Sequence, residues 1–76
     1  MRGLFEMMNR RYEGEFGEAI RWEEVENKMY CSRPLDLERI FYSIREEGFF
    51  PDSINNIIIS VHEEEGFVLI EELGFR

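Results

Sequence analysis

His62 and the three glutamates that follow it come nearest to a metal site in this sequence. Imidazole and carboxylate groups both bind divalent cations, and Glu63, Glu64 and Glu65 come directly after the histidine. No spacing in the sequence supports the ligand number or the geometry that such an ion requires. We therefore expect no metal and no other cofactor.

Cys31 and His62 are the residue types of a nucleophile and its base, but no motif in the sequence orients one toward the other. As the only cysteine, Cys31 forms no internal disulfide and no cysteine-rich zinc site, and we expect a free thiol. Adjacent glutamates such as residues 23–24 and 71–72 point apart along an extended chain. The sequence thus predicts no catalytic residue, and we expect a protein that is not an enzyme.

Net charge is the strongest signal in the sequence. Seventeen acidic residues against nine lysines and arginines give a net charge of −8. A field of this sign repels phosphate backbones, so we expect no direct binding of DNA or RNA. It attracts basic protein surfaces instead, although acidic residues also serve solubility alone, and that alternative stays open.

The predicted partner-binding residues are mostly the glutamates of the C-terminal third. We expect them to form one contiguous acidic face, because they lie on a predicted hairpin and directly after its second strand. Trp22 is either an interface anchor or a core residue, and Phe75 is the aromatic residue that we expect to be most exposed. The acidic face comprises Glu63, Glu64, Glu65, Glu71 and Glu72, with Glu46 and Glu47 nearby.

A helix over residues 36–47 is the clearest element that these side chains depend on. Leu37, Ile40, Phe41 and Ile44 fall at helical spacing on one apolar stripe, which we expect to face the core. Around this stripe, Pro34 precedes the helix, Asp36 is its N-cap or first-turn acid, and Gly48 follows its last turn.

The remaining elements are short. A β-branched run at residues 57–61 predicts a strand that pairs with residues 67–71 as an antiparallel hairpin. Residues 18–22 predict another strand, residues 28–31 an irregular segment, and residues 49–52 a turn that carries Phe49 and Phe50 to the core. Residues 1–17 are poorly defined: the pattern suits a short helix at first, and then a strand from Tyr12 to Phe16.

These elements predict a small single α+β domain, in which one main helix packs on a short, mainly antiparallel sheet. At 76 residues and 43% hydrophobic content, the chain suits one ordered domain. No apolar run approaches the roughly 20 residues of a membrane span, and charge comes too early for a secretory signal. We expect a cytoplasmic protein that needs no membrane.

Four phrases of the sequence resemble the N-terminal domain of the ParB/sulfiredoxin superfamily. They are residues 20–25, 43–49, 57–61 and 66–70, and the likeness covers residues 20–76. It implies a strand, a helix and a hairpin that lead to a nucleotide-binding box. That box falls at residues 71–76, where Glu71 and Glu72 stand in place of a phosphate cradle, so we expect a degenerate, truncated site without nucleotide binding.

Two function classes follow from these observations. The first is a small acidic inhibitor that docks on a basic nucleic-acid-handling protein and competes with its DNA or RNA. DNA mimics of phages and mobile elements, such as anti-CRISPR and anti-restriction proteins, have this size and charge. The alternative is a degenerate ParB-like module in DNA partition or transcriptional regulation. Self-association as a homodimer is left open.

Overall fold

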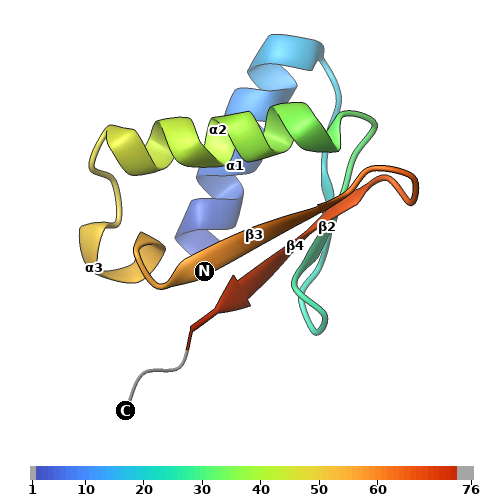
Figure 1. Cartoon of the computed structure of the whole chain (residues 1–76). Helices are drawn as coiled ribbons and strands as arrows, with labels where there is room; N and C mark the ends of the chain where they lie inside the picture. The colour runs from blue at the N-terminus through green and yellow to red at the C-terminus, as the bar shows by residue number, and fades with distance from the viewer. Residues whose placement is uncertain (1, 74–76) are drawn as a thin grey trace.

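The computed structural model describes residues 2–73, which form three helices and four strands (Figure 1). The elements follow one another in the order α1 (Arg2–Phe16), β1 (Arg21–Glu23), β2 (Lys28–Tyr30), α2 (Pro34–Glu46), α3 (Pro51–Ile54), β3 (Ile57–His62) and β4 (Phe67–Glu72).

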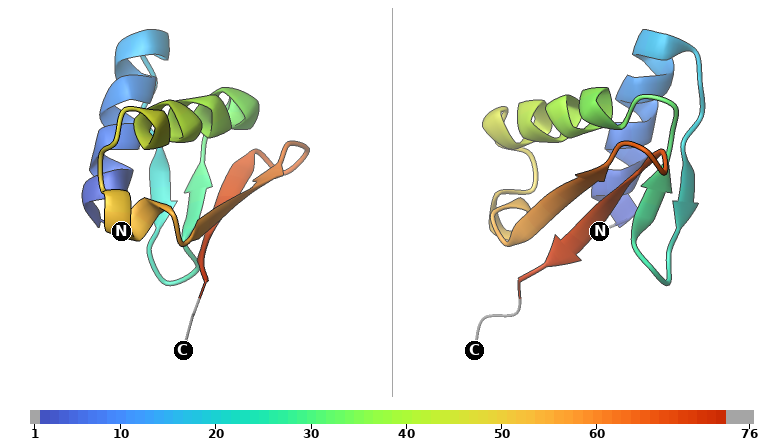
Figure 2. Two further views of the ribbon diagram at one scale, coloured as in Figure 1. Left: turned by 60° about the vertical axis from the view of Figure 1, so that its left-hand side comes forward. Right: turned by 45° about the vertical axis from the view of Figure 1, so that its right-hand side comes forward.

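All four strands belong to one antiparallel sheet with the order β1-β2-β4-β3. Helices α1 and α2 cover one face of this sheet, and within residues 2–73 no helix covers the other face (Figure 2). The predicted α+β class and the C-terminal hairpin are confirmed. In the hairpin, Ile57 lies opposite Glu72, and His62 lies opposite Phe67.

Helix α2 carries the predicted apolar stripe. Leu37, Ile40, Phe41 and Ile44 are all at most 2% exposed, so this prediction is confirmed. The helix begins at Pro34, two residues earlier than predicted, because proline's fixed φ and missing N–H suit the first helical turn. Of the two roles considered for Asp36, the structure confirms the first-turn acid, since Arg33 occupies the cap position. Gly48 follows the cap residue Glu47 with a φ of +83°.

Helix α1 corrects the interpretation of residues 1–17. From Arg2 to Phe16 the chain is one continuous helix, and the strand predicted from Tyr12 onward is wrong. Leu4, Met8 and Tyr12 recur every four residues and are at most 3% exposed. Burial of this stripe against the rest of the domain outweighs the short strand-like alternation. The helix ends where Gly17 adopts a φ of +71°.

Three other segments differ from the predictions. The strand expected at residues 18–22 is β1, Arg21–Glu23, and the segment expected to be irregular is strand β2. Strand β2 pairs on both sides, with β1 and with β4, and Met29 at its centre is buried. At the predicted turn, Phe50 packs against the core, but Phe49 is 44% exposed, so only one of the two rings enters it.

The core lies between the two long helices and the sheet. It is apolar throughout, and no buried side-chain polar atom among the described residues lacks a hydrogen-bond partner. Its members come from every element except β1 and are Leu4, Met8, Tyr12, Ile20, Met29, Leu37, Ile40, Phe41, Ile44, Ile54, Ile57, Ile59, Val68 and Ile70.

Candidate protein-interaction surface

The glutamates predicted to form one face lie at opposite ends of the hairpin. Glu63, Glu64 and Glu65 form the turn between β3 and β4, whereas Glu71 and Glu72 lie beside the start of β3. Gly66 and four residues of β4 separate Glu65 from Glu71, which corresponds to about 15–20 Å. The expectation that any pairing of these strands brings the five acids together is therefore wrong.

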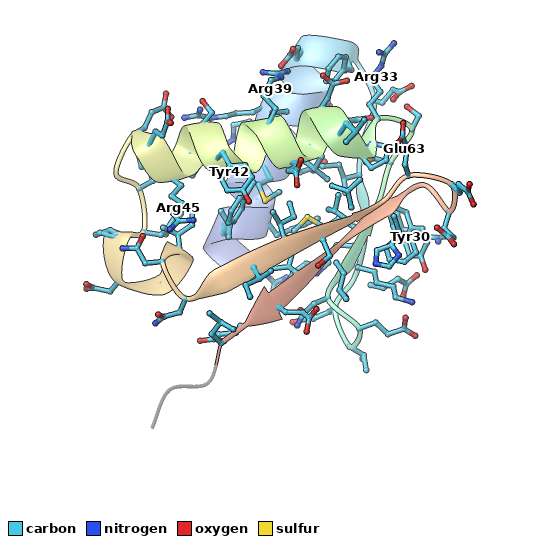
Figure 3. The ribbon with its side chains drawn as sticks, in the orientation of Figure 1. Tyr30, Arg33, Arg39, Tyr42, Arg45 and Glu63 are labelled. Carbon is cyan, nitrogen blue, oxygen red and sulfur yellow. The ribbon has the colours of Figure 1, made fainter. Side chains whose placement is uncertain are left out.

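Glu46 and Glu47 lie at a third place, the C-terminal end of α2. Figure 3 shows Glu63 near the other end of that helix, so the hairpin turn and Glu46 do not adjoin. The Glu47 carboxylate forms an ion pair with Arg11, which ties the end of α2 to α1. Glu47 thus has a structural role within the domain.

Glu71 and Glu72 instead lie toward the same end of the sheet as the turn between β1 and β2. The Ile70 N–H donates to the Asn27 carbonyl oxygen at 2.9 Å, which continues the β2–β4 pairing into that turn. Asn27 of this turn therefore lies beside Ile70, and beyond that point the turn and the last residues of β4 diverge (Figure 2). We call this region the acidic end of the sheet; its exposed carboxylates belong to Glu23, Glu24, Glu26, Glu71 and Glu72.

Two cations partly balance the acidic end. Lys28 Nζ lies 2.9 Å from Glu26 Oε2, and Arg21 Nε lies 3.5 Å from Glu23 Oε1. The Glu26 carboxylate raises the pKa of Lys28 above its ordinary value. Among the described residues, Glu24, Glu71 and Glu72 take part in no ion pair. These three carboxylates remain available to an external cation.

Val25 stands at the tip of the acidic end and is 99% exposed. Leu73, just after β4, is 39% exposed. Sequence reasoning missed this arrangement, because it considered residues 23–24 only as a solvated pair and did not predict that β2 adjoins β4. The sequence feature that could have indicated this surface is the apolar Val25 between Glu24 and Glu26, which lies at the turn of the β1–β2 hairpin.

Trp22 packs inside the molecule. Its side chain is half-buried, and its ring stacks on Phe5 of α1, with 4.4 Å between ring centroids. Of the two interpretations left open, packing against the core is the one that the structure confirms. Phe75, the other aromatic candidate, lies outside the described residues.

A row of rings crosses the open face of the sheet. Arg21 lies over Tyr30 at 4.3 Å, Tyr30 lies 5.2 Å from Phe67, and Phe67 stacks on His62 at 4.5 Å. Strands β1, β2, β4 and β3 each supply one member. Sequence reasoning missed this row too, because it predicted an irregular segment at Tyr30.

Cys31 and His62 do not form a nucleophile–base pair. The Cys31 N–H donates to the Gly66 carbonyl oxygen at 2.9 Å, while His62 lies opposite Phe67 on the other side of β4. With β4 between them, the two residues are about 10 Å apart. Partial burial raises the pKa of the Cys31 thiol, which keeps it protonated at neutral pH.

A hydrogen-bond network joins the end of α1 to the loop before α2. The Tyr12 hydroxyl donates to Glu18 Oε2 at 3.0 Å, and the Ser32 hydroxyl donates to the same oxygen. These two donors, Ser32 foremost, lower the pKa of Glu18, whereas burial raises the pKa of Tyr12. The Arg33 N–H in turn donates to the Tyr12 hydroxyl oxygen at 3.2 Å, so the network holds the two segments together.

Residues 2–73 contain no cluster of three or more histidine, cysteine or acidic side chains placed to hold a metal ion, and no pocket was found in this part of the chain. No helix in the same range is both long and apolar enough to span a bilayer.

Comparisons with known proteins gave no match to a family model, to a curated protein or to a solved structure.

Proposed function

We propose that this protein is a non-enzymatic interaction protein that binds a basic protein surface through the acidic end of its sheet. The observation that carries the proposal is the 99% exposed Val25 between Glu24 and Glu26, at an end of the sheet that also carries the exposed Glu71 and Glu72. An apolar side chain at an end of the sheet where carboxylates outnumber cations combines an anchor that loses water on contact with charges that set orientation.

The two parts of this surface contribute differently to binding. Burial of a valine side chain stabilises a complex by about 1.5 kcal/mol, and this term acts mainly on dissociation. The carboxylates raise the rate of association with a basic partner, and this contribution falls as salt screens the charges. Glu24, Glu71 and Glu72 contribute most, because no cation of the described chain neutralises them.

The partner we propose is a nucleic-acid-handling protein, because a surface basic enough to attract a chain of net charge −8 is typical of phosphate-binding proteins. Occupation of that surface by carboxylates excludes DNA or RNA from it. The protein would then act as an inhibitor of the anti-CRISPR or anti-restriction type.

The test compares two triple variants of equal charge. One changes Glu24, Glu71 and Glu72 to lysine at the acidic end. The matched control changes Glu13 on α1, and Glu64 and Glu65 in the turn at the other end of the hairpin, in the same way. Tagged protein captures partners from host lysate for mass spectrometry, and association rates with the captured partner are then measured at two salt concentrations.

We expect the acidic-end variant to lose capture and the control to retain most of it. Equal loss in both variants would mean that net charge alone drives binding. Unchanged capture by both would show that the glutamates only solvate the surface. A Val25→Ser variant should leave the association rate unchanged and speed dissociation about tenfold.

The ParB-like alternative stays a prediction, since part of the expected nucleotide box, residues 74–76, lies outside the described residues. Calorimetry with CTP and ATP distinguishes the two functions. A saturable isotherm would favour the partition or transcription module over the inhibitor.

A further inference from the structure

Strand β3 forms one border of the sheet, and its outward backbone groups can be identified from the hydrogen bonds of its neighbours. The Cys31 N–H donates to Gly66 and the Ile70 N–H to Asn27, so even-numbered residues of β4 bond toward β2. Odd-numbered residues of β4 therefore bond toward β3, where the register pairs them with even-numbered residues.

It follows that Ile57, Ile59 and Val61 point their N–H and C=O groups outward from the sheet. The Leu73 N–H bond to the Asn56 carbonyl oxygen, at 2.6 Å, agrees with this alternation. In the part of the chain that the structure describes, no backbone hydrogen bond from another element reaches this border. Nothing is drawn in front of β3 in Figure 1.

This border lacks the usual protection of an edge strand. Natural edges carry charges, prolines or bulges that prevent further pairing. Residues 57–62 read Ile-Ile-Ile-Ser-Val-His and contain no lysine, acid, proline or glycine. The other border, β1, is only three residues long and carries Arg21 and Glu23. The open edge is therefore specific to β3.

Exposed apolar side chains flank the border on both faces of the sheet. Ile58 is 46% exposed on the open face. On the helical face, Tyr42 of α2 is 44% exposed and extends toward β3 in Figure 3. Leu35, 53% exposed, lies seven residues earlier and thus on the same side of α2. A strand added to this edge would bury all three.

The charges beside β3 complement each other in a twofold arrangement. Arg45 lies near the start of the strand and Glu63 follows its end, as Figure 3 shows. Neither side chain takes part in an ion pair within the described residues. When two copies of β3 run antiparallel, each copy's Arg45 comes beside the other copy's Glu63.

We propose that a second copy of this chain pairs with β3, antiparallel and about a twofold axis that runs perpendicular to the sheet between the Ile59 residues of the two copies. Ile57 then lies opposite the partner subunit's Val61, and all outward N–H and C=O groups of the three odd residues are paired. This register keeps the helices of both copies on the same face, where the two Tyr42 side chains meet. The sheet becomes continuous across both copies. The proposal does not depend on the proposed function.

Amide hydrogen exchange at two protein concentrations tests the seam directly. The amides of Ile57, Ile59 and Val61 should exchange at least about tenfold more slowly in concentrated than in dilute protein. Those of Ile58, Ser60 and His62 are bonded to β4 in either state and should change little. The proposal is overturned if sedimentation shows a monomer at millimolar concentration. It is also overturned if the protein is a dimer in which the amides of Ile57, Ile59 and Val61 exchange as fast as in the monomer.

A charge exchange tests the register. Arg45→Glu and Glu63→Arg should each weaken dimerisation about tenfold, and the double variant should restore it. The controls Arg10→Glu and Glu13→Arg make the same changes of charge on exposed positions of α1 and should leave the dimer intact. Failure of the double variant to recover refutes the twofold register, and so does equal weakening by the controls.

Discussion

Met8→Ala tests whether α1 is an integral part of the domain. Met8 is 0% exposed and lies between Leu4 and Tyr12 on the buried stripe of α1. Truncation of a fully buried methionine costs about 2–5 kcal/mol, the sum of lost transfer free energy and the cavity left behind. A domain of 76 residues has a free energy of unfolding of about 4–11 kcal/mol. A loss of about 3 kcal/mol should therefore lower Tm by roughly 12–24 °C.

The single tryptophan makes the assay specific. Because Trp22 stacks on Phe5, its fluorescence reports docking of α1 on the sheet, while far-UV circular dichroism reports all helices. We expect the two urea transitions to coincide in wild type and in Met8→Ala. Arg10→Ala, at an exposed position of the same helix, is the control and should change stability by less than about 0.5 kcal/mol. Two results would refute integral packing of α1. One is a loss of less than about 0.5 kcal/mol in the free energy of unfolding of Met8→Ala, and the other is a fluorescence transition at lower urea concentration than the circular dichroism transition.

Three further predictions concern single groups. Because burial raises its pKa above the ordinary 9.0, Cys31 should react with iodoacetamide more slowly at neutral pH in the native state than in urea, and native reactivity matching the unfolded chain would contradict this. Because its pKa is lowered from the ordinary value of 4.5, Glu18 stabilises the fold fully at pH values above 4.5, and this contribution disappears as the pH falls through the lowered pKa. The difference in free energy of unfolding between wild type and Glu18→Gln should therefore become smaller when urea unfolding is repeated at decreasing pH, and a difference that does not change with pH would contradict this. Gly66→Ala should destabilise by about 1–2 kcal/mol because its φ is +77°, whereas Gly14→Ala, inside α1 with no neighbour within 4 Å, should stabilise by about 0.5–1 kcal/mol; urea unfolding of both variants checks the opposite signs.

Local patterns were sufficient for the elements whose residues are neighbours in the chain. The stripe of α2 needs only a spacing of three and four residues, and Leu37 and Ile40 are buried as that spacing predicts. The β-branched run of β3 and the return of β4 also follow from adjacent residues, so the antiparallel hairpin could be predicted, although each strand extends one residue further, to His62 and Glu72. The net charge, which underlies the proposed partner class, depends on composition alone.

Long-range packing decided the rest. Strand β2 has only three residues and becomes a strand because β1 and β4 pair with it on both sides. That pairing places the turn that carries Glu24 at the same end of the sheet as Glu71, whereas Glu64 lies at the other end of the hairpin, the reverse of what proximity in the sequence suggested. Helix α1 likewise depends on a buried stripe that only the folded core provides. Sequence alone thus determined how many acids the protein carries, whereas tertiary structure decided which of them lie together, because neighbouring strands in a sheet need not be neighbours in the chain.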